Sequence, residues 1–229
     1  MLTKEITTSR FDTYSAEELV LWAANKFDDG LVMSTSFGIQ SAVTLHLTTR
    51  IRPEISVIWV DTGYLPQETI DYARQLTELL NLNLHVVKSP ISPAEMEVRY
   101  GRLWESQRVE DLNRYDRIRK IEPMQDAMEA LGATARISGL RADQTDYRSE
   151  LPRAKKTDSI FMVHPILNWT NQDIDQYMRK FELPQHPLWS KGYQTVGDAH
   201  SSRPVSSSDV SERETRFRGI KQECGLHYS

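Results

Sequence analysis

The chain has 229 residues, of which 39% are hydrophobic and 26% are charged, and its net charge is −4. This length supports one substantial hydrophobic core. The sequence contains no apolar run long enough to cross a bilayer, and its acidic balance argues against general nucleic-acid binding. Residues 1–11 lack the apolar stretch of a signal peptide, so we expect a cytoplasmic protein that binds neither membranes nor nucleic acid.

Helices and short apolar strands alternate along the chain. A capping-box pair, Ser15 and Glu18, opens the first helix, and Thr170 with Asp173 caps a later one. Pro66 suits the first turn of another helix. The apolar spacing predicts helices over 15–27, 39–49, 66–80 and from 170 onward, and strands over 31–34, 55–60, 84–87, 135–138 and 161–164.

This alternation, with strands that are apolar on both sides, predicts an α/β fold with a doubly wound, mostly parallel sheet. Ligands bind such sheets beyond the carboxyl ends of the strands. Two of those ends are polar and contain glycine, residues 34–38 and 61–63. Backbone N–H groups of residues 34–41 could meet a phosphate closely, although an ordinary strand-to-helix turn also selects serine and glycine.

The chain has a single cysteine, Cys224, which rules out an internal disulfide. No group of cysteine and histidine residues has zinc-binding spacing, so no metal site is expected. Lys221 and His227 lie close to Cys224 in the sequence, and a nearby cation favours the nucleophilic thiolate. An exposed tail cysteine without a role is the alternative.

The last part of the chain differs in composition from the rest. Residues 197–216 are rich in serine and charged residues and contain almost no apolar ones, which is typical of a mobile segment. We therefore expect an α/β domain over residues 1–204 and a mobile C-terminal tail over residues 205–229 that contains the cysteine.

Basic residues outnumber acidic ones over residues 99–120 and 136–156, although the whole chain is acidic. Such clusters could attract a compact anion, and they could equally form a solvated charged surface. The basic residues considered as candidates are Arg119, Lys120, Arg141, Arg148 and Arg216.

Several stretches resemble, in the same order, the phosphoadenylyl sulfate (PAPS) reductase family, from about residue 15 to the end of the chain. The combination of ECGLH at 223–227 with STSFGIQ at 34–40 is highly specific. The other matching stretches are DTGY at 61–64, KIEPM at 120–124, GLR at 139–141, HPLW at 186–189, GY at 192–193, VGD at 196–198 and ETRF at 214–217.

The resemblance implies an adenine-nucleotide alpha-hydrolase-like fold, related to the PP-loop ATP pyrophosphatases. Those relatives grip pyrophosphate with the sequence SGGxDS, whereas residues 37–40 here are FGIQ, so cleavage of ATP is not expected. By the same resemblance, Tyr193 and His227 lie near the chemistry. The residues implied to lie near the nucleotide are Ser34, Ser36, Gly38 and Asp61, and those implied to contact its anionic groups are Lys120, Arg141, Arg148 and Arg216.

One branch of the family reduces adenylyl sulfate and contains an iron–sulfur cluster bound by four cysteines. The corresponding positions here are Tyr115, Asp116, Asp198 and Ser201, none of which supplies a thiolate. We therefore expect no cofactor, and the 3′-phosphorylated nucleotide PAPS as the substrate. A cluster-free adenylyl sulfate reductase is the alternative.

The reaction expected from this resemblance is attack of the Cys224 thiolate on the sulfuryl sulfur, which forms a thiosulfonate. A chain with one cysteine cannot resolve that intermediate, so a partner dithiol, thioredoxin or glutaredoxin, would release sulfite for sulfate assimilation. Relatives are commonly homodimers, and we expect the same here. Two rivals stay open: a PP-loop enzyme that uses ATP, and a nucleotide-sensing module whose cysteine is incidental.

Overall fold

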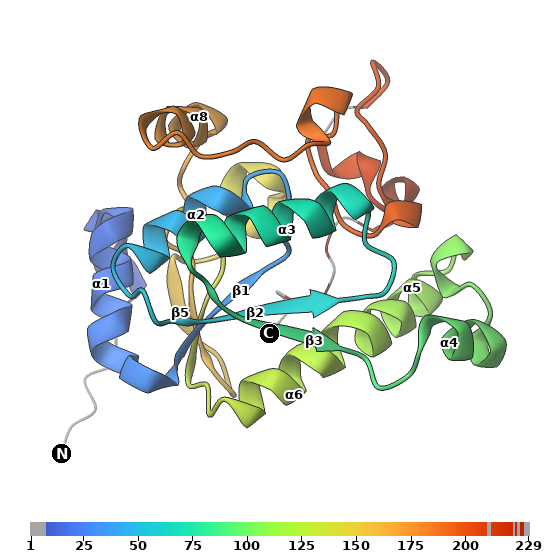
Figure 1. Cartoon of the computed structure of the whole chain (residues 1–229), viewed down its shortest axis with the longest axis horizontal. Coiled ribbons are helices and arrows are strands. Elements are labelled where there is room, and N and C mark those ends of the chain that lie inside the picture. The colour runs from blue at the N-terminus through green and yellow to red at the C-terminus, as the bar shows by residue number, and fades with distance from the viewer. Residues whose placement is uncertain (1–7, 210–211, 222, 224, 227–229) are drawn as a thin grey trace.

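The computed structural model describes residues 8–209, 212–221, 223, 225 and 226. Its centre is a six-stranded sheet with helices on both faces, which confirms the predicted doubly wound α/β class (Figure 1). Cys224 and His227 lie outside the described residues. The expected boundary between a domain and a tail at residue 204 stays a prediction.

The sheet has the strand order β3-β2-β1-β4-β6-β5, and all neighbouring strands are parallel except β6 and β5, which are antiparallel. Because β2 and β4 flank β1, the order in which strands are added reverses at β1, and ligands bind at such a switch point. The strands are β1 (Leu31–Thr35), β2 (Ser56–Asp61), β3 (Asn83–Lys88), β4 (Ala135–Ile137), β5 (Ala154–Lys156) and β6 (Phe161–Val163).

Helices α1, α2, α3 and α8 lie on one side of the sheet, and α6 lies on the other (Figure 1). None of the described helices is both long and apolar enough to cross a membrane. The helices are α1 (Ala16–Phe27), α2 (Ser41–Thr49), α3 (Gln67–Leu80), α4 (Pro93–Tyr100), α5 (Val109–Asp116), α6 (Glu122–Ala130), α7 (Asp146–Ser149) and α8 (Asn171–Lys180).

Successive residues of the central strands point to opposite faces, and each face has its own apolar cluster. Met33 and Val57 belong to the larger cluster, with side chains from α1, α2 and α3, whereas Val32 and Ile58 pack with Met124 of α6. All five side chains are buried. Burial on both faces explains why β1 and β2 are apolar runs rather than alternating sequences.

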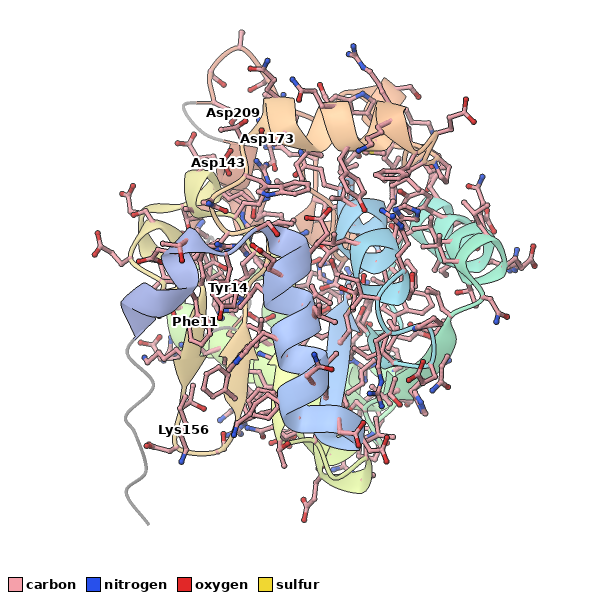
Figure 2. The ribbon with its side chains drawn as sticks, turned by 90° about the vertical axis from the view of Figure 1, so that its left-hand side faces the viewer. Phe11, Tyr14, Asp143, Lys156, Asp173 and Asp209 are labelled. Atoms are coloured by element: carbon pink, nitrogen blue, oxygen red, sulfur yellow. The ribbon has the colours of Figure 1, made fainter. Side chains whose placement is uncertain are left out.

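The antiparallel edge strand β5 is covered by the start of the chain. The 3-10 turn Thr8–Thr13 lies beside it, and Figure 2 shows Phe11 and Tyr14 at this edge. Arg153, which precedes β5, donates to the carbonyl of Phe11 at 2.8 Å and to that of Pro165 at 2.7 Å. This cover protects a strand edge that could otherwise pair with another chain.

The elements with strong local signals agree with their predictions. Both hydrogen bonds of the capping box between Ser15 and Glu18 are present, and α3 begins directly after Pro66. The sequence signals did not identify β5 or the helices α4 to α7. β5 has three residues, two of them exposed, and α7 has four residues, so neither is long enough to show a periodic apolar pattern. Helices α4, α5 and α6 do bury one apolar side each, with Met96, Leu112 and Met124, and the predictions missed them.

The described part of residues 197–216 packs against the domain, although its low apolar content predicted a mobile segment. Asp198, Thr215 and Arg216 are buried, and Ser202 forms an isolated β-bridge with Arg216. Buried polar groups of this kind are stable when they are hydrogen-bonded. Composition alone did not reveal this packing, because the stretch is held mainly by polar contacts.

Candidate active site

A cavity of about 230 Å³ opens at the carboxyl ends of β1, β2 and β4, where the topology places the ligand site. Its cationic side chains are Lys120, Arg148, Arg213 and Arg216, of which Arg213 was not predicted. The predicted site residues that line the cavity are Ser34, Ser36, Gly38, Lys120, Arg148 and Arg216. These residues therefore come together from distant parts of the chain.

The loop between β1 and α2 forms one wall of this cavity. Phe37 has a positive φ of 48°, and its buried ring packs edge-on against Trp59 at 5.0 Å. The Thr35 hydroxyl accepts a hydrogen bond from the Phe37 N–H at 3.1 Å, which holds the turn. Gln40, at the N-cap of α2, makes no side-chain bond to the helix end. Because Gln40 and Ser41 also line the cavity, the start of α2 is available to an anion.

At the end of β2, the side chain of Thr62 lines the cavity and that of Asp61 does not. The Asp61 carboxylate accepts a hydrogen bond from the Gly63 N–H at 2.9 Å and pairs with Lys88 at 2.9 Å, and Asp61 is not among the described residues that line the cavity. Thr62 does line the cavity, and its hydroxyl donates to Asp198. Asp61 therefore stabilises the turn in this structure, while Thr62 and Asp198 face the site.

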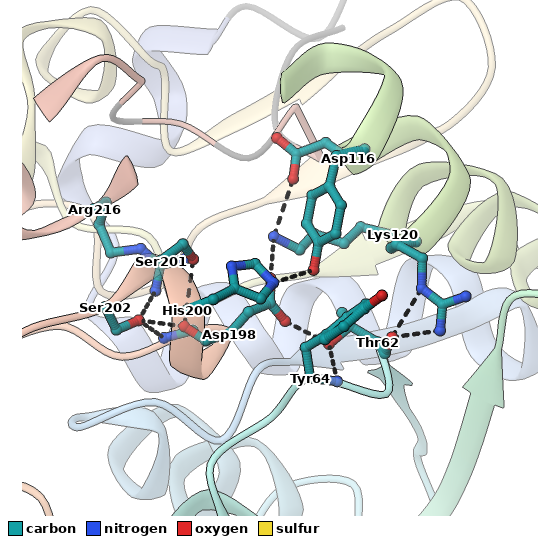
Figure 3. Close-up of polar contacts among 12 residues, drawn as sticks. Thr62, Tyr64, Asp116, Lys120, Asp198, His200, Ser201, Ser202 and Arg216 are labelled. Carbon is teal, nitrogen blue, oxygen red and sulfur yellow. Dashed lines mark hydrogen bonds and ion pairs between the residues drawn. The ribbon is translucent and has the colours of Figure 1, made fainter. Parts of the chain in front are cut away.

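Lys120 lies in a π-helical turn, Arg117–Ile121, which joins α5 to α6. Its Nζ lies 3.0 Å from Asp116 Oδ1 and 2.9 Å from Asp198 Oδ2, so one ammonium bridges two buried carboxylates (Figure 3). Burial opposes the ionisation of Asp198, but Lys120 and the Thr62 hydroxyl hold the pKa of Asp198 well below its ordinary value. Interruptions of this kind in a helix often mark functional sites.

The side chains of His200, Trp104 and Tyr115 form an aromatic group next to the ion pair of Lys120 and Asp198. His200 stacks on Trp104 at 4.5 Å, and its Nε2 lies 3.1 Å from the hydroxyl of Tyr115. Figure 3 shows His200 beside Asp198 and Lys120. Burial, with the charges of Lys120 and Arg216, lowers the pKa of His200 to about 4. His200 is therefore neutral near pH 7, and the positive charge of this wall comes from Lys120.

Tyr115, Asp116, Asp198 and Ser201, which the family resemblance aligned with the cluster cysteines of the adenylyl sulfate branch, lie in this same region. Lys120 connects Asp116 with Asp198, and Tyr115 hydrogen-bonds to Asp198. The Ser201 hydroxyl donates to the carbonyl of Asp198 at 3.3 Å. The donors here are oxygen atoms that surround an ammonium group, and oxygen donors of this kind do not match the thiolate set of an iron–sulfur cluster.

Arg216 enters the cavity from the C-terminal stretch. Its Nη1 donates to the Ser202 hydroxyl at 3.0 Å, and its guanidinium lies over the ring of Phe217 at 5.8 Å. These contacts hold a buried guanidinium at the cavity wall. An arginine held in this way can bind a phosphate or sulfate group in two places at once.

Arg148 is also buried, and its guanidinium is bound by the C-terminal tail. Its Nε and Nη2 each donate to the Glu223 carboxylate at 2.8 Å, and the Thr145 hydroxyl donates to the same carboxylate at 2.8 Å. Arg213 approaches Glu223 at 3.5 Å. Glu223 belongs to the ECGLH motif, but the motif by itself predicted no role for it, and no local signal in the sequence marks Arg213 as a site residue.

Two other predicted residues lie outside the cavity wall in the described part of the chain. Arg141 is buried, but its guanidinium bonds to Asp143 at 2.6 Å and to Asn171 at 2.8 Å. Tyr193 packs with Ile39 and its neighbours beside the cavity. Neither Arg141 nor Tyr193 is among the described residues that line the cavity, although Tyr193 packs against Ile39 and Val196, which do line it.

Glu223, directly before Cys224 in the sequence, and Leu226, two residues after it, both belong to this region. Glu223 bonds to Arg148, and Leu226 lines the cavity. Arg136 Nη2 donates to the carbonyl of Leu226 at 2.6 Å, so β4 also contacts the tail. The positions of Cys224 and His227 themselves lie outside the described residues.

A mostly parallel sheet with a cavity lined by cationic side chains at its switch point is typical of nucleotide-binding α/β proteins. Solved structures with the same architecture include a PAPS reductase from Candida auris in a phosphate complex, with a TM-score of 0.74 and 26% identity over 89% of this chain and 99% of that one. Candida glabrata FMN adenylyltransferase with FAD and pyrophosphate has a TM-score of 0.62 at 13% identity, over 96% of this chain and 76% of that one. The second likeness shows the fold alone.

The sequence comparisons are more specific. The profile of the phosphoadenosine phosphosulfate reductase domain matches residues 30–204. The phosphoadenosine 5′-phosphosulfate reductase of Synechococcus sp. is 56% identical over 93% of this chain and 92% of its own length. The reductases of Synechocystis sp. and Shewanella oneidensis are 53% and 48% identical, over 96% and 93% of this chain and 88% and 86% of their own lengths. The chain belongs to the phosphoadenosine phosphosulfate reductase family, which is a family of oxidoreductases that act on sulfur.

Proposed function

We propose that this chain reduces PAPS to sulfite and adenosine 3′,5′-bisphosphate, as a step of sulfate assimilation, with Cys224 as the nucleophile. The observation that supports this most directly is the cavity at the ends of β1, β2 and β4. It combines four cationic side chains with the start of α2, and the segment that contains the single cysteine passes beside it. This arrangement suits an adenine nucleotide with several anionic groups.

The charge of the substrate explains why so many cations are needed. PAPS has about four negative charges near pH 7, given the second ionisation of its 3′-phosphate. An approaching thiolate is repelled unless positive side chains offset these charges. Lys120, Arg148 and Arg216 would supply them, together with Arg213. Asp61 and Arg141, which the family resemblance also implied, have protein partners and lie away from the cavity wall, so we expect smaller effects from them.

The proposed reaction has two steps. The Cys224 thiolate attacks the sulfuryl sulfur, the bond from sulfur to the phosphate oxygen breaks, and adenosine 3′,5′-bisphosphate leaves with that electron pair. A thiolate of a partner dithiol then attacks Cys224 Sγ of the thiosulfonate, and sulfite leaves with the electron pair of the S–S bond. The second thiol of the partner closes its disulfide and frees Cys224. His227 would stabilise the thiolate or orient the sulfate, and Tyr193 would act near the same group.

The partners and the absence of a cofactor are further parts of this proposal. Since Cys224 is the single cysteine, an external dithiol such as thioredoxin or glutaredoxin must supply the electrons, which suits a reducing cytoplasm. The carboxylates of Asp116 and Asp198 around Lys120 support a reaction without an iron–sulfur cluster. We propose PAPS as the preferred substrate and a homodimer as the assembly. A cluster-free adenylyl sulfate reductase is the second candidate.

Sulfite release in the presence of thioredoxin, thioredoxin reductase and NADPH tests the proposal, with PAPS and adenylyl sulfate compared as substrates. We expect a strong preference for PAPS. The variant Cys224→Ser should lose sulfite production and still bind adenosine 3′,5′-bisphosphate. Preference for adenylyl sulfate would keep the cysteine mechanism and reject the 3′-phosphate assignment. Substantial sulfite production by Cys224→Ser would reject the mechanism.

A further inference from the structure

Two charged side chains of the tail, Lys221 and Glu223, are buried against the domain. Their side chains are 8% and 3% exposed, and each ends on an opposite charge: Lys221 on Asp116, and Glu223 on Arg148. These partners come from different elements, α5 and α7. Long charged side chains are rarely buried unless they are paired, so the two contacts fix where this part of the tail lies.

Asp116 is completely buried and is shared between two lysines. Its Oδ1 lies 3.0 Å from Lys120 Nζ, and its Oδ2 lies 2.6 Å from Lys221 Nζ, which also donates to Asn113 at 2.8 Å. Without Lys221, the Lys120 ammonium would face two carboxylates, Asp116 and Asp198, and this group would have a net negative charge. With Lys221 in place, the two lysines balance the two carboxylates of Asp116 and Asp198. The two carboxylates then offset less of the attraction between Lys120 and an anionic ligand.

Glu223 makes the complementary contact on the other side of residue 222. Its two carboxylate oxygens accept from Nε and Nη2 of Arg148, each at 2.8 Å, and Thr145 adds a third hydrogen bond. Burial opposes the ionisation of Glu223, but Arg148 and Arg213 lower its pKa below the ordinary value, so the group is charged near pH 7. Fork-shaped arginine–carboxylate pairs are geometrically specific as well as strong, and this pair therefore defines one register of the tail.

We propose that Lys221 and Glu223 are positioning residues, which seat the tail on the domain in one register so that Cys224 is presented to the bound nucleotide. This rests on the proposed role of Cys224 as the nucleophile. The two ion pairs, Asp116–Lys221 and Arg148–Glu223, act together because they are two residues apart on the tail and join separate elements of the domain. Loss of Glu223 leaves the buried Arg148 without its main carboxylate partner, and loss of Lys221 leaves Asp116 and Asp198 to share the single ammonium of Lys120. Either loss favours release of the tail.

The single cysteine makes the proposal measurable without catalysis. The probe is iodoacetamide, which alkylates Cys224 alone because the chain has no other thiol. The rate is taken at the alkaline plateau, where the thiol is fully ionised, so that it reports accessibility. The variants are Lys221→Met and Glu223→Gln, and the control is Arg218→Gln, which changes an exposed charge of the same tail.

We expect both variants to be alkylated at least about tenfold faster than the wild type and the control, because each leaves one buried ion pair broken. A direct effect on the thiol would have opposite signs for Lys221→Met and Glu223→Gln, since they remove opposite charges, whereas release of the tail accelerates both. In turnover with PAPS, kcat should fall about tenfold or more while KM changes far less, since positioning acts on the bound complex. Lys221→Arg should restore most of kcat.

Alkylation rates and kcat equal to those of Arg218→Gln would overturn the proposal. Tighter binding of adenosine 3′,5′-bisphosphate to Glu223→Gln without loss of kcat would also overturn it, because Glu223 would then compete with the nucleotide for Arg148. If the wild type forms no sulfite but the alkylation rates differ as expected, the proposed reaction fails and the seating of the tail stands. If the wild type forms sulfite but the alkylation rates are equal, the proposed reaction stands and the proposed seating of the tail fails.

Discussion

The guanidinium of Arg216 lies against the backbone of Gly197, in the space that a Cβ at residue 197 would occupy. Both residues contribute to the wall of the cavity. The Ser202 hydroxyl accepts hydrogen bonds from both the guanidinium and the Gly197 N–H, each at 3.0 Å. The absence of a side chain at residue 197 is therefore what allows this arginine to lie at the cavity.

Gly197→Ala should weaken binding of adenosine 3′,5′-bisphosphate by about tenfold or more, because the added methyl group displaces a charged donor worth about 1.5–3 kcal/mol. Calorimetric titration measures the loss. Arg216→Met should produce a similar loss, and the double variant should bind no worse than Arg216→Met alone. Fully additive losses would contradict the idea that Gly197 acts through Arg216.

Asp198→Asn should destabilise the fold by about 3 kcal/mol, because it breaks a fully buried pair and leaves Lys120 with less compensation. Urea unfolding monitored by tryptophan fluorescence measures the change. The matched control is Glu68→Gln, which breaks an ion pair with the exposed Lys191 and should cost less than about 1 kcal/mol. Equal losses for the two variants would show that burial does not matter at Asp198.

Stability should fall as the pH falls from about 6.5 toward 3, in part because of His164. Burial, with the charges of Arg136 and Arg148, lowers the pKa of His164 to about 3, from an ordinary value of 6.5. Since the unfolded chain binds this proton more readily, the stability contributed by neutral His164 is complete above about pH 6.5 and is lost toward the folded pKa, at about 1.4 kcal/mol per unit of pKa difference.

The measurement is the urea midpoint across this pH range for the wild type and for His164→Gln. The variant lacks the titrating group, so its midpoint should depend less steeply on pH, whatever its stability at neutral pH. Parallel curves for the two proteins would show that His164 does not contribute to the pH dependence.

Phe37→Ala should destabilise the protein by about 3–5 kcal/mol, because it removes a completely buried ring and leaves a cavity beside Trp59. Affinity for adenosine 3′,5′-bisphosphate should also fall, since the ring anchors the loop that lines the site. Phe37→Leu, which retains most of the buried volume, should lose clearly less of both. If a folded Phe37→Ala protein bound adenosine 3′,5′-bisphosphate with unchanged affinity, the Phe37 ring would not be needed to hold the loop in its binding conformation.

Local signals in the sequence were sufficient for the main elements of the fold. The capping boxes at Ser15 and Thr170 and the apolar runs of β1 and β2 depend on near neighbours, so they can be recognised without a structure. Local sequence signals did not predict the π-helical turn that contains Lys120 or the strand β5. These elements are short, and their conformation depends on what packs against them.

For the site, the residues at the strand ends were predictable because parallel strands bring their carboxyl ends to one edge. Ser34, Ser36 and Gly38 line the cavity for that reason. Arg141 also follows a strand, yet its guanidinium turns to Asp143 and Asn171. The direction of a long side chain depends on which partners surround it, and sequence position does not contain that information.

The amino-acid sequence by itself determined the class of fold, the family and the single thiol, because the alternation of helices and strands follows apolar patterning and the family motifs are contiguous. Only the tertiary structure decided which charges share a partner. Asp116 and Lys221 are 105 residues apart in the chain, and Arg148 and Glu223 are 75 apart. No local pattern can pair such residues, since burial and distance in the folded chain decide whether two charges meet.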